Sequence, residues 1–435
     1  MSPVIIGLLG ILAFLALVLL GLPIATGMML VGMVGFGILT NMPAAIKLVS
    51  VDMFSSFSSY NMSVVAMFAW MGFLAFHSGI GSRLYDFAYK MIGHWPGGLA
   101  MASEMACACF GAVCGSGPAT TATIGSIAFP EMKKRGYDSS LYTACVASGG
   151  GLGLLIPPSM TAIVYGVATE QSIGRIFIAG IGAGILLMVL FMITIWLVTR
   201  NHPEMAPRGE KSTWPERAKS VSGGLLETLI IFIFSVGGLS AGWFTPTEGG
   251  AIGAFAMLAV VLVRRKLSWK GFVASLYDTA KTVGMVLLIV ACATIFGRFI
   301  ALAQIPLAIT GLLYQFDIPA WQTMVCILVV YLIAGCFIDS LPMIMLTVPI
   351  FYPVVVSIGY DPIWFGVIIT LVCCMGMITP PVGIDVYVAK NVAVDVPLPV
   401  IFKGIWPFLF AIFICIALIM IFPQIVLFLP ELLMG

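Results

Sequence analysis

Long apolar stretches, separated by short polar segments, follow one another along almost the whole chain. A helix needs about 20 apolar residues to cross the hydrocarbon core of a bilayer. The pattern predicts membrane-spanning helices at residues 3–20, 23–46, 60–80, 139–168, 174–199, 225–243, 247–263, 281–303, 361–392 and 404–430. We therefore expect an all-α polytopic membrane protein.

Two further apolar stretches, 97–130 and 319–354, are interrupted near their middle by small or helix-breaking residues. The interruptions are Cys114–Pro118 in the first stretch and Ile338–Pro342 in the second. Each stretch is either two ordinary spans joined by a short turn or a re-entrant hairpin whose tip is buried at mid-depth. Both alternatives return the chain to the side from which it entered, so topology does not separate them.

Composition supports a membrane protein and excludes other classes. Of the 435 residues, 61% are hydrophobic and 9% are charged, whereas soluble proteins are about 25% charged. The net charge of +2, without a basic patch, argues against a nucleic-acid-binding protein. The three histidines and ten cysteines have no metal-ligand spacing, and the sequence contains no phosphate-binding loop or catalytic motif. We therefore do not expect an enzyme.

The distribution of Lys and Arg predicts the orientation. With the N-terminus on the outer side, all but three of the 20 basic residues fall on the cytoplasmic side, as the positive-inside rule requires. The exceptions are Lys47, Arg175 and Arg298. The long polar loop at 200–219 is then cytoplasmic and separates two halves of the chain.

The two halves come into register when the sequence is shifted by 223 residues. The matching positions are Pro96 with Pro319, Ser116 with Asp339, Pro130 with Pro353, Gly136–Asp138 with Gly359–Asp361, Gly153 with Gly376, and Pro157-Pro158 with Pro380-Pro381. An odd number of predicted spans separates the two interrupted stretches, so the two copies should face opposite ways. Inverted-topology repeats of this kind are typical of secondary transporters.

This interpretation divides the chain into scaffold helices, a linker and two repeats. The scaffold helices are 1–60 and 225–280, and the cytoplasmic linker is 201–224. The first repeat is 61–200, with a hairpin at 97–130 and a broken helix at 139–168; the second is 281–435, with a hairpin at 319–354 and a broken helix at 361–392.

Prolines predict breaks inside two of the long apolar segments, at Pro157-Pro158 and at Thr379–Pro381. Proline removes a backbone donor and clashes with the preceding turn. Unwound backbone at membrane depth survives only within protein or beside a water-filled cavity. Two broken helices and two hairpin tips near the midplane would therefore offer carbonyl oxygens to small cations and helix N-termini to an anion.

Four charged residues inside apolar segments are candidates for a site, because a charge at the bilayer centre costs about 2.5–3.5 kcal/mol on insertion scales. Asp339, at the second tip, is interpreted as an ion or substrate ligand. Asp385 either binds a ligand or forms a structural ion pair, and Glu104 either joins the site or faces the cytoplasmic end. Arg298 is either an interfacial side chain or a partner of Asp339 or of a substrate carboxylate.

Two small-residue segments, Gly115–Thr123 and Gly149–Gly153, either form binding tips or allow close helix packing. A third segment, Thr245–Gly250, has the pattern of a helix N-cap with an early acidic residue. We interpret this third segment as structural.

These residues resemble the large membrane subunit of tripartite ATP-independent periplasmic (TRAP) transporters of the dicarboxylate or sialic-acid type. The resemblance covers essentially the whole chain. Its most specific pieces are Gly115–Thr121, Gly149–Pro158 with Ile156–Ser159, Thr245–Gly250, Ile338–Pro342, and Thr379–Gly383 with Asp385.

The resemblance implies an elevator-type secondary transporter in the bacterial inner membrane. It implies sodium-coupled import of a small organic acid, either sialic acid or a four-carbon dicarboxylate, with Na+ as coupling ion and no organic cofactor. It also implies two protein partners, namely a separate small four-helix membrane subunit and a periplasmic substrate-binding protein.

The resemblance also implies site residues. One sodium ion would be held by Cys114, Ser116, Gly153, Ile156 and Pro158, and the other by Gly335, Asp339, Thr379 and Gly383. The substrate would lie near Ser116, Thr120, Thr161 and Arg298. A hydroxyl would serve sodium better than the Cys114 thiol, so we expect that residue to contribute its backbone carbonyl.

Three rival functions are open. A stand-alone sodium/dicarboxylate symporter of the divalent-anion type shares hairpins and inverted repeats but needs no binding protein. An ion channel would need a continuous polar path, whereas the polar residues here cluster at the tips. An intramembrane enzyme would need a paired nucleophile and base or a metal cluster.

Overall fold

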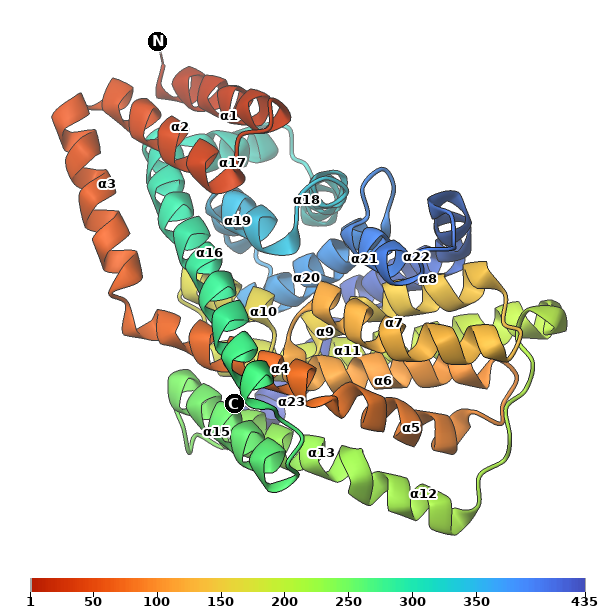
Figure 1. Cartoon of the computed structure of the whole chain (residues 1–435). Helices are drawn as coiled ribbons and strands as arrows, with labels where there is room; N and C mark the ends of the chain where they lie inside the picture. Colours follow the sequence, from red (N-terminus) through yellow and green to blue (C-terminus); the bar gives the residue numbers. More distant parts are fainter. Residues whose placement is uncertain (1, 435) are drawn as a thin grey trace.

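The computed structural model describes residues 2–434, and all regular secondary structure in that range is helical (Figure 1). The all-α class expected from the sequence is confirmed. Within residues 2–434, eight helices, counted with the short segments that continue them, are long and apolar enough to cross a membrane.

The helices of the first half are α1 (Pro3–Leu19), α2 (Ile24–Leu39), α3 (Met42–Phe57), α4 (Ser63–Ser78), α5 (Ile80–Ile92), α6 (Gly98–Cys114), α7 (Gly117–Lys134), α8 (Ser139–Gly150), α9 (Leu152–Leu155), α10 (Met160–Thr169) and α11 (Ile173–Asn201). Those of the second half are α12 (Trp214–Ser220), α13 (Leu226–Phe232), α14 (Gly238–Ser240), α15 (Pro246–Val263), α16 (Trp269–Leu302), α17 (Ile305–Gln315), α18 (Ala320–Gly335), α19 (Ser340–Ser357), α20 (Pro362–Ile378), α21 (Ile384–Val392), α22 (Leu398–Ile421) and α23 (Gln424–Met434). Two π-helical turns, Val221–Leu225 and Ile233–Gly237, join α12, α13 and α14 into one continuous helical segment.

The long helix α16 connects the two ends of the molecule. Its 34 residues correspond to about 51 Å at 1.5 Å per residue, well beyond the bilayer core of about 30 Å. Figure 1 shows α16 running from the end formed by α1, α2, α3 and α17 down to α15. It packs against α2 and α4 on the way, so it ties the N-terminal helices to the rest of the protein.

The interrupted elements lie at the centre of the fold. The segment Ser139–Thr169, which contains α8, α9 and α10, is 83% buried over its most apolar window. The corresponding value is 39% for Trp214–Ser240 and for Pro246–Val263. The broken helix is therefore surrounded by protein, whereas the other two segments lie at the periphery.

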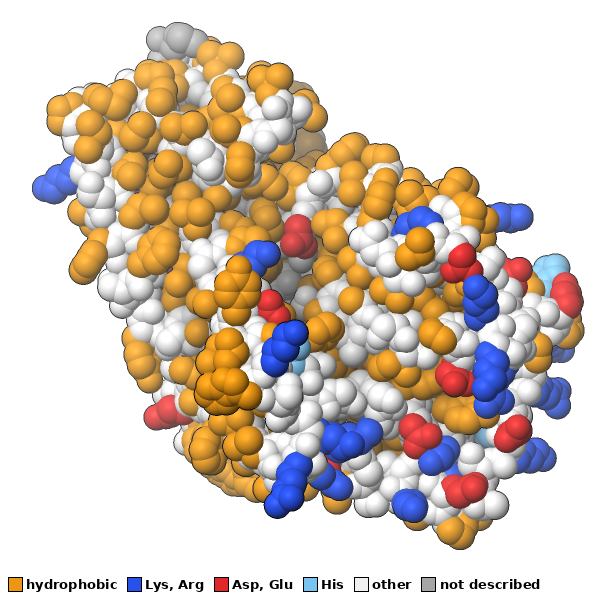
Figure 2. All heavy atoms as spheres, in the orientation of Figure 1, with side chains coloured by type: hydrophobic (Ala, Val, Ile, Leu, Met, Phe, Trp, Pro, Cys, Tyr) orange, Lys and Arg blue, Asp and Glu red, His pale blue; other side chains and the backbone are white. Residues whose placement is uncertain are grey.

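The surface divides into an apolar and a charged region. Figure 2 shows hydrophobic side chains over the end formed by α1–α3, where Leu8, Leu9 and Leu12 are each at least half exposed. Charged side chains gather toward the opposite end, near α5 and α12 (Figure 2). An exposed apolar surface of this extent is what a lipid environment requires.

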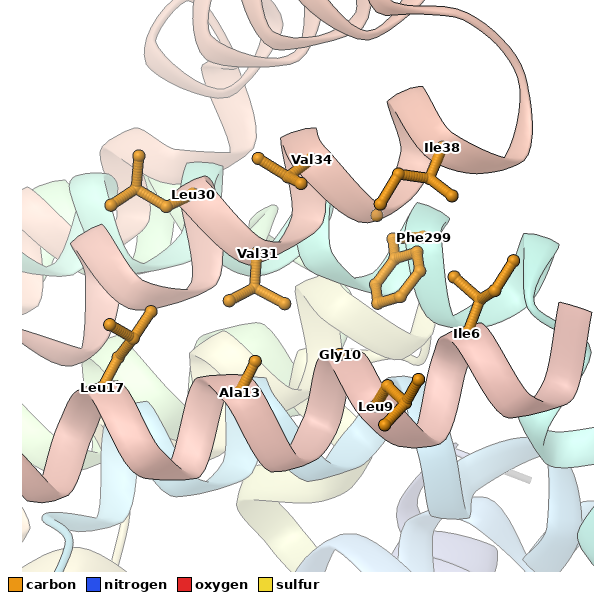
Figure 3. A pocket seen from close by; sticks show the side chains of 11 residues that line it. Ile6, Leu9, Gly10, Ala13, Leu17, Leu30, Val31, Val34, Ile38 and Phe299 are labelled. Atoms are coloured by element: carbon orange, nitrogen blue, oxygen red, sulfur yellow. The ribbon is translucent and has the colours of Figure 1, made fainter. Parts of the chain in front are cut away.

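An apolar groove of about 420 Å³ lies between α1 and α2 (Figure 3). Ile6, Leu9, Val34 and Ile38 are among its lining residues, and Phe299 of α16 reaches into it (Figure 3). A Cβ atom at Gly10 or Gly35 would collide with the Phe299 ring. The two glycines therefore let α16 pack closely against both N-terminal helices.

Several predicted span boundaries are wrong. The span expected at 23–46 ends at Leu39, and a new helix, α3, begins at Met42. The cause is local, because the side chain of Asn41 accepts a hydrogen bond of 2.8 Å from the backbone N–H of Ala44 and caps the new helix. The apolar pattern continues through this cap, so periodicity alone did not reveal it.

Other helices were missed or misjudged in length. The amphipathic α5 and the short α17 were not expected. The stretch predicted at 404–430 consists of two helices, α22 and α23. Thr245, in contrast, forms the expected N-cap: its N–H donates to Glu248 Oε2 at 2.8 Å, and its hydroxyl accepts from the N–H of Glu248 at 3.3 Å.

Candidate functional site

The tip between α6 and α7 lies against the first helix break. Gly115 has a φ of +67°, which favours glycine, and a Cβ atom there would collide with the carbonyl oxygen of Pro158. The backbone N–H of Met160, at the start of α10, donates to Gly115 O at 3.4 Å. The positive φ and this close approach together explain why a glycine occupies the tip.

Two of the residues expected to hold the first ion, Ser116 and Gly153, meet at this contact with Thr120, which was expected near the substrate. The Thr120 hydroxyl is buried and donates to Ser116 O at 2.7 Å. A Cβ atom at Gly153 would lie 3.0 Å from Ser116 O and 2.5 Å from Thr120 Oγ1. The oxygens of Ser116 and Thr120 therefore face the backbone of Gly153 across a space that a larger residue would fill.

Other residues expected to hold the first ion or the substrate face different neighbours. A Cβ atom at Gly72 of α4 would lie 2.7 Å from Cys114 O, so that carbonyl is directed toward α4. The Ile156 side chain packs against Gly184 of α11. Thr161 is buried at the start of α10, and its hydroxyl has no hydrogen-bond partner among residues 2–434.

The residues expected to hold the second ion are less tightly gathered than those at the first tip. A Cβ atom at Gly376 would lie 2.7 Å from Gly335 Cα, so the end of α18 packs directly on α20. Asp339 caps α19, accepting from the N–H of Ser340 at 2.6 Å. The Thr379 hydroxyl donates to Met375 O at 2.6 Å, and Gly383 has a φ of +61° where α21 begins. The hydrogen bonds that the structure gives to Asp339 and Thr379 are thus local, within their own hairpin or helix.

Arg298 is engaged elsewhere. Its Nε lies 2.7 Å from Oδ2 of Asp52, which belongs to α3 and is 2% exposed. Neither of the alternatives derived from the sequence included Asp52. The available signal was that Asp52 is the acidic residue of an otherwise uncharged run between residues 48 and 82.

Two further acidic residues are fully buried. Asp385, at the start of α21, is 0% exposed, and both of its carboxylate oxygens lack hydrogen-bond partners in the described chain. No ion pair with Asp385 is formed among residues 2–434, so the structural ion-pair alternative is wrong for the conformation seen here. Glu104 of α6 is also 0% exposed, and its Oε2 would lie 2.7 Å from a Cβ atom at Gly149 of α8.

The chemistry of these groups is that of oxygen ligands. They are carboxylates, hydroxyls and backbone carbonyls at the ends of broken helices. Within residues 2–434 no group of three or more His, Cys, Asp or Glu side chains could hold a metal ion. Oxygen-only surroundings suit hard cations.

The chain is similar to known proteins over nearly its whole length. The family model described as "Tripartite ATP-independent periplasmic transporter, DctM component" matches residues 11–425. The C4-dicarboxylate TRAP transporter large permease protein DctM of Pseudomonas aeruginosa is 34% identical over 392 residues, covering 89% of this chain and 90% of that protein. The sialic acid TRAP transporter large permease protein SiaM of Vibrio cholerae is 31% identical over 426 residues, 98% of each. The ectoine/5-hydroxyectoine TRAP transporter large permease protein UehC of Ruegeria pomeroyi is 34% identical over 427 residues, 97% of this chain and 98% of that protein.

Two solved structures have a similar fold. The YdaH transporter of Alcanivorax borkumensis gives a TM-score of 0.61 at 13% identity, over 88% of this chain and 90% of that chain. MtrF of Neisseria gonorrhoeae gives a TM-score of 0.52 at 12% identity, over 87% and 84%. The relatives in sequence are transporter permeases, which agrees with the expectation that this chain is not an enzyme.

Proposed function

The chain belongs to the DctM family of tripartite ATP-independent periplasmic transporters, and on this premise we propose that it imports a small organic acid by sodium-coupled secondary transport. Its family and its helices make it a multi-pass protein of the inner membrane. The solutes in the relatives' names include C4-dicarboxylates, sialic acid and ectoine, all of which carry a carboxylate. A carboxylate is therefore the feature that we expect the site to recognise.

The observation that carries the proposal is the contact between the first hairpin tip and the first helix break. Ser116 O and Thr120 Oγ1 converge on Gly153 at that contact. Carbonyl and hydroxyl oxygens at such a break are the groups by which discontinuous helices coordinate sodium. A sodium ion bound there would hold the tip against α9, so that the N-terminus of α10 and the Thr161 hydroxyl form part of the anion site.

The second ion position would use Gly335, Asp339, Thr379 and Gly383. The close packing of Gly335 on Gly376 supports it, because that contact brings the end of α18 to the helix that contains Thr379. In the proposed cycle, both ions organise the substrate site between the tips before the loaded domain moves relative to the scaffold, as in an elevator. Only a difference in affinity between the ion-loaded and empty states can couple the ion gradient to the substrate.

Two partners complete the proposed system. A periplasmic binding protein delivers the substrate, and a small four-helix membrane subunit packs on the scaffold. The N-terminus then lies on the periplasmic side, with the segment around α12 in the cytoplasm. The charged residues near α5 and α12, which include Arg83, Lys90, Arg217 and Lys219, support this orientation.

Uptake into proteoliposomes tests the proposal. The chain and its small subunit are reconstituted, and uptake of radiolabelled sialic acid and of succinate is measured with and without an inward sodium gradient and the binding protein. We expect uptake of one of these acids only when both are present. Uptake without the binding protein would favour the stand-alone symporter, and an ion current without uptake would favour the channel.

A pair of variants locates the site. Thr120→Val removes the hydroxyl that faces Gly153 and should lower sodium-driven uptake at least tenfold. Thr123→Val is the matched control, because Thr123 lies in the same helix and donates to Ala119 O at 2.7 Å, away from the break. Equal uptake by the two variants would contradict the assignment of the first ion position.

A further inference from the structure

Asp385 is a buried carboxylate without a partner, in the half of the second broken helix that follows Gly383. α21, which carries it, packs against α7 of the first hairpin and α8 of the first broken helix. Asp385 is 0% exposed, and neither carboxylate oxygen receives a hydrogen bond or an ion pair within the described residues. An ionised carboxylate in such a place is strongly disfavoured unless something compensates its charge.

A second buried oxygen beside it is also unpartnered. The hydroxyl of Thr121, in α7, has no hydrogen-bond partner in the part of the chain that the structure describes, and Thr121 is 0% exposed. This differs from its neighbours Thr120 and Thr123, whose hydroxyls both donate to a carbonyl four residues back. Among the described residues, the Thr121 hydroxyl therefore does not make the bond to a carbonyl four residues back that Thr120 and Thr123 make in the same helix.

Both oxygens converge on one small space at Gly150. A Cβ atom at Gly150 would lie 3.0 Å from Asp385 Oδ2 and 3.1 Å from Gly117 O, and it would collide with Thr121 Oγ1. From the other side, a Cβ atom at Gly117 would lie 3.2 Å from Asp385 Oδ2 and 3.3 Å from Gly150 O. Two glycines therefore leave open a space that four oxygens face: one carboxylate, one hydroxyl and two carbonyls.

The backbone around Gly150 fits this arrangement. The N–H of Gly151 donates to Ser148 O at 3.0 Å, and the N–H of Leu154 donates to Gly151 O at 3.1 Å. Neither of these bonds at the helix break uses the carbonyl of Gly150. That carbonyl stands at the end of α8, where helix carbonyls carry partial negative charge.

We propose that Asp385 Oδ2, Thr121 Oγ1, Gly117 O and Gly150 O form a binding site for a dehydrated monovalent cation of the size of sodium. Hard cations take carboxylate, hydroxyl and carbonyl oxygens as ligands. A single carboxylate balances a single positive charge, which favours a monovalent ion over Ca2+. None of the four ligands belongs to the two ion positions described above, so this site adds a third.

The location gives the third site a specific consequence. Its ligands come from the first hairpin, the first broken helix and the second broken helix. A cation bound there would join elements of both halves of the protein, whereas each of the other two positions draws on one half. Its occupancy should therefore fix α21 against α7 and α8.

Sodium binding measured directly tests the proposal without relying on uptake. The purified chain with its small subunit is titrated with radioactive sodium at constant ionic strength, with choline as the replacing cation. We expect Asp385→Asn to bind one sodium ion fewer at saturation than the unmodified protein. Thr121→Val preserves the side-chain shape and should weaken one site at least tenfold, whereas Thr123→Val should bind as the unmodified protein does.

The outcomes separate this proposal from the transport function. Unchanged sodium stoichiometry in Asp385→Asn together with unchanged affinity in Thr121→Val would overturn the third site and leave the other two intact. Loss of one ion in Asp385→Asn, with the remaining ions still bound, would support it. Should Asp385→Asn not fold, the affinity of Thr121→Val decides alone.

Discussion

The thiol of Cys374 donates a hydrogen bond of 3.2 Å to the backbone carbonyl of Gly151, across 223 residues of sequence. That separation equals the offset that brings the two halves of the sequence into register, so each residue contacts its own counterpart. When a two-fold axis relates two halves of a protein, a residue and its counterpart come into contact near that axis. Helix α19 (Ser340–Ser357) also begins and ends 223 residues after α7 (Gly117–Lys134). These relationships support the predicted inverted repeat.

The packing of Gly335 on Gly376 gives a first prediction. Gly376→Ala places a methyl group 2.7 Å from Gly335 Cα and should destabilise the protein by about 1–3 kcal/mol, the usual cost of overpacking. Thermal unfolding of the purified protein measures the effect. Gly284→Ala is the control, because a Cβ atom there would have no atom within 4 Å among the described residues, apart from its chain neighbours and its own helix backbone. Equal melting temperatures for the two variants would show that α18 and α20 do not pack this closely.

A charged cluster near the ends of α5, α13 and α15 gives a second prediction. Glu227 Oε2 lies 2.8 Å from Arg83 Nη1, and Glu227 also pairs with Arg264. Glu227→Ala leaves two arginines without their shared partner. We expect a loss of about 2 kcal/mol, below the 3–5 kcal/mol of fully buried pairs, because the Arg264 side chain is 46% exposed.

The matched control for Glu227 is an exposed ion pair of similar length. Asp86 Oδ2 lies 2.9 Å from Lys90 Nζ, and the Asp86 side chain is 53% exposed. Asp86→Ala should cost less than about 1 kcal/mol in the same unfolding assay. A larger loss for Asp86→Ala than for Glu227→Ala would contradict the role of the cluster.

A third prediction concerns Arg298 and Asp52. Because Asp52 is buried and its carboxylate contacts Arg298, removing either charge should destabilise the protein, and removing both should cost less than the sum. A double-mutant cycle with Asp52→Asn and Arg298→Gln should give a coupling energy of about 1 kcal/mol. If Arg298 instead binds the substrate carboxylate, Arg298→Gln will raise the KM for uptake while Asp52→Asn will not.

A fourth prediction is a pH dependence in α12. The hydrogen bond from the Thr213 N–H to Glu216 Oε2, of 2.8 Å, holds the pKa of Glu216 below its ordinary value of 4.5. Because the pKa of Glu216 is lowered in the folded state, its hydrogen bond with Thr213 stabilises α12 above pH 4.5. This stabilisation is lost as the pH falls through the folded pKa. Hydrogen exchange of residues 214–220, corrected for intrinsic rates, should rise below pH 4.5.

Glu216→Gln provides the control for that measurement. Glutamine can accept the same hydrogen bond but does not titrate. The variant should therefore show no comparable rise in corrected exchange at low pH. A rise of equal size in both proteins would mean that another group controls the stability of α12.

The sequence by itself determined the membrane class, the positions of the interruptions and the family resemblance. These properties depend on composition and on local backbone chemistry. The break after Leu155 follows from Pro157 and Pro158, and the turns at Gly115 and Gly383 follow from the positive φ that glycine adopts easily. Each of these signals is contained within a few neighbouring residues.

Only the tertiary structure decided which polar groups meet. The sequence showed Arg298 and Asp385 as charges inside apolar segments, but it did not decide between the alternative roles of either residue. The fold pairs Arg298 with Asp52 and leaves Asp385 facing Thr121 and Gly150. Such contacts join residues far apart in the chain, and they depend on how closely the helices approach, which is set by packing and not by any local pattern.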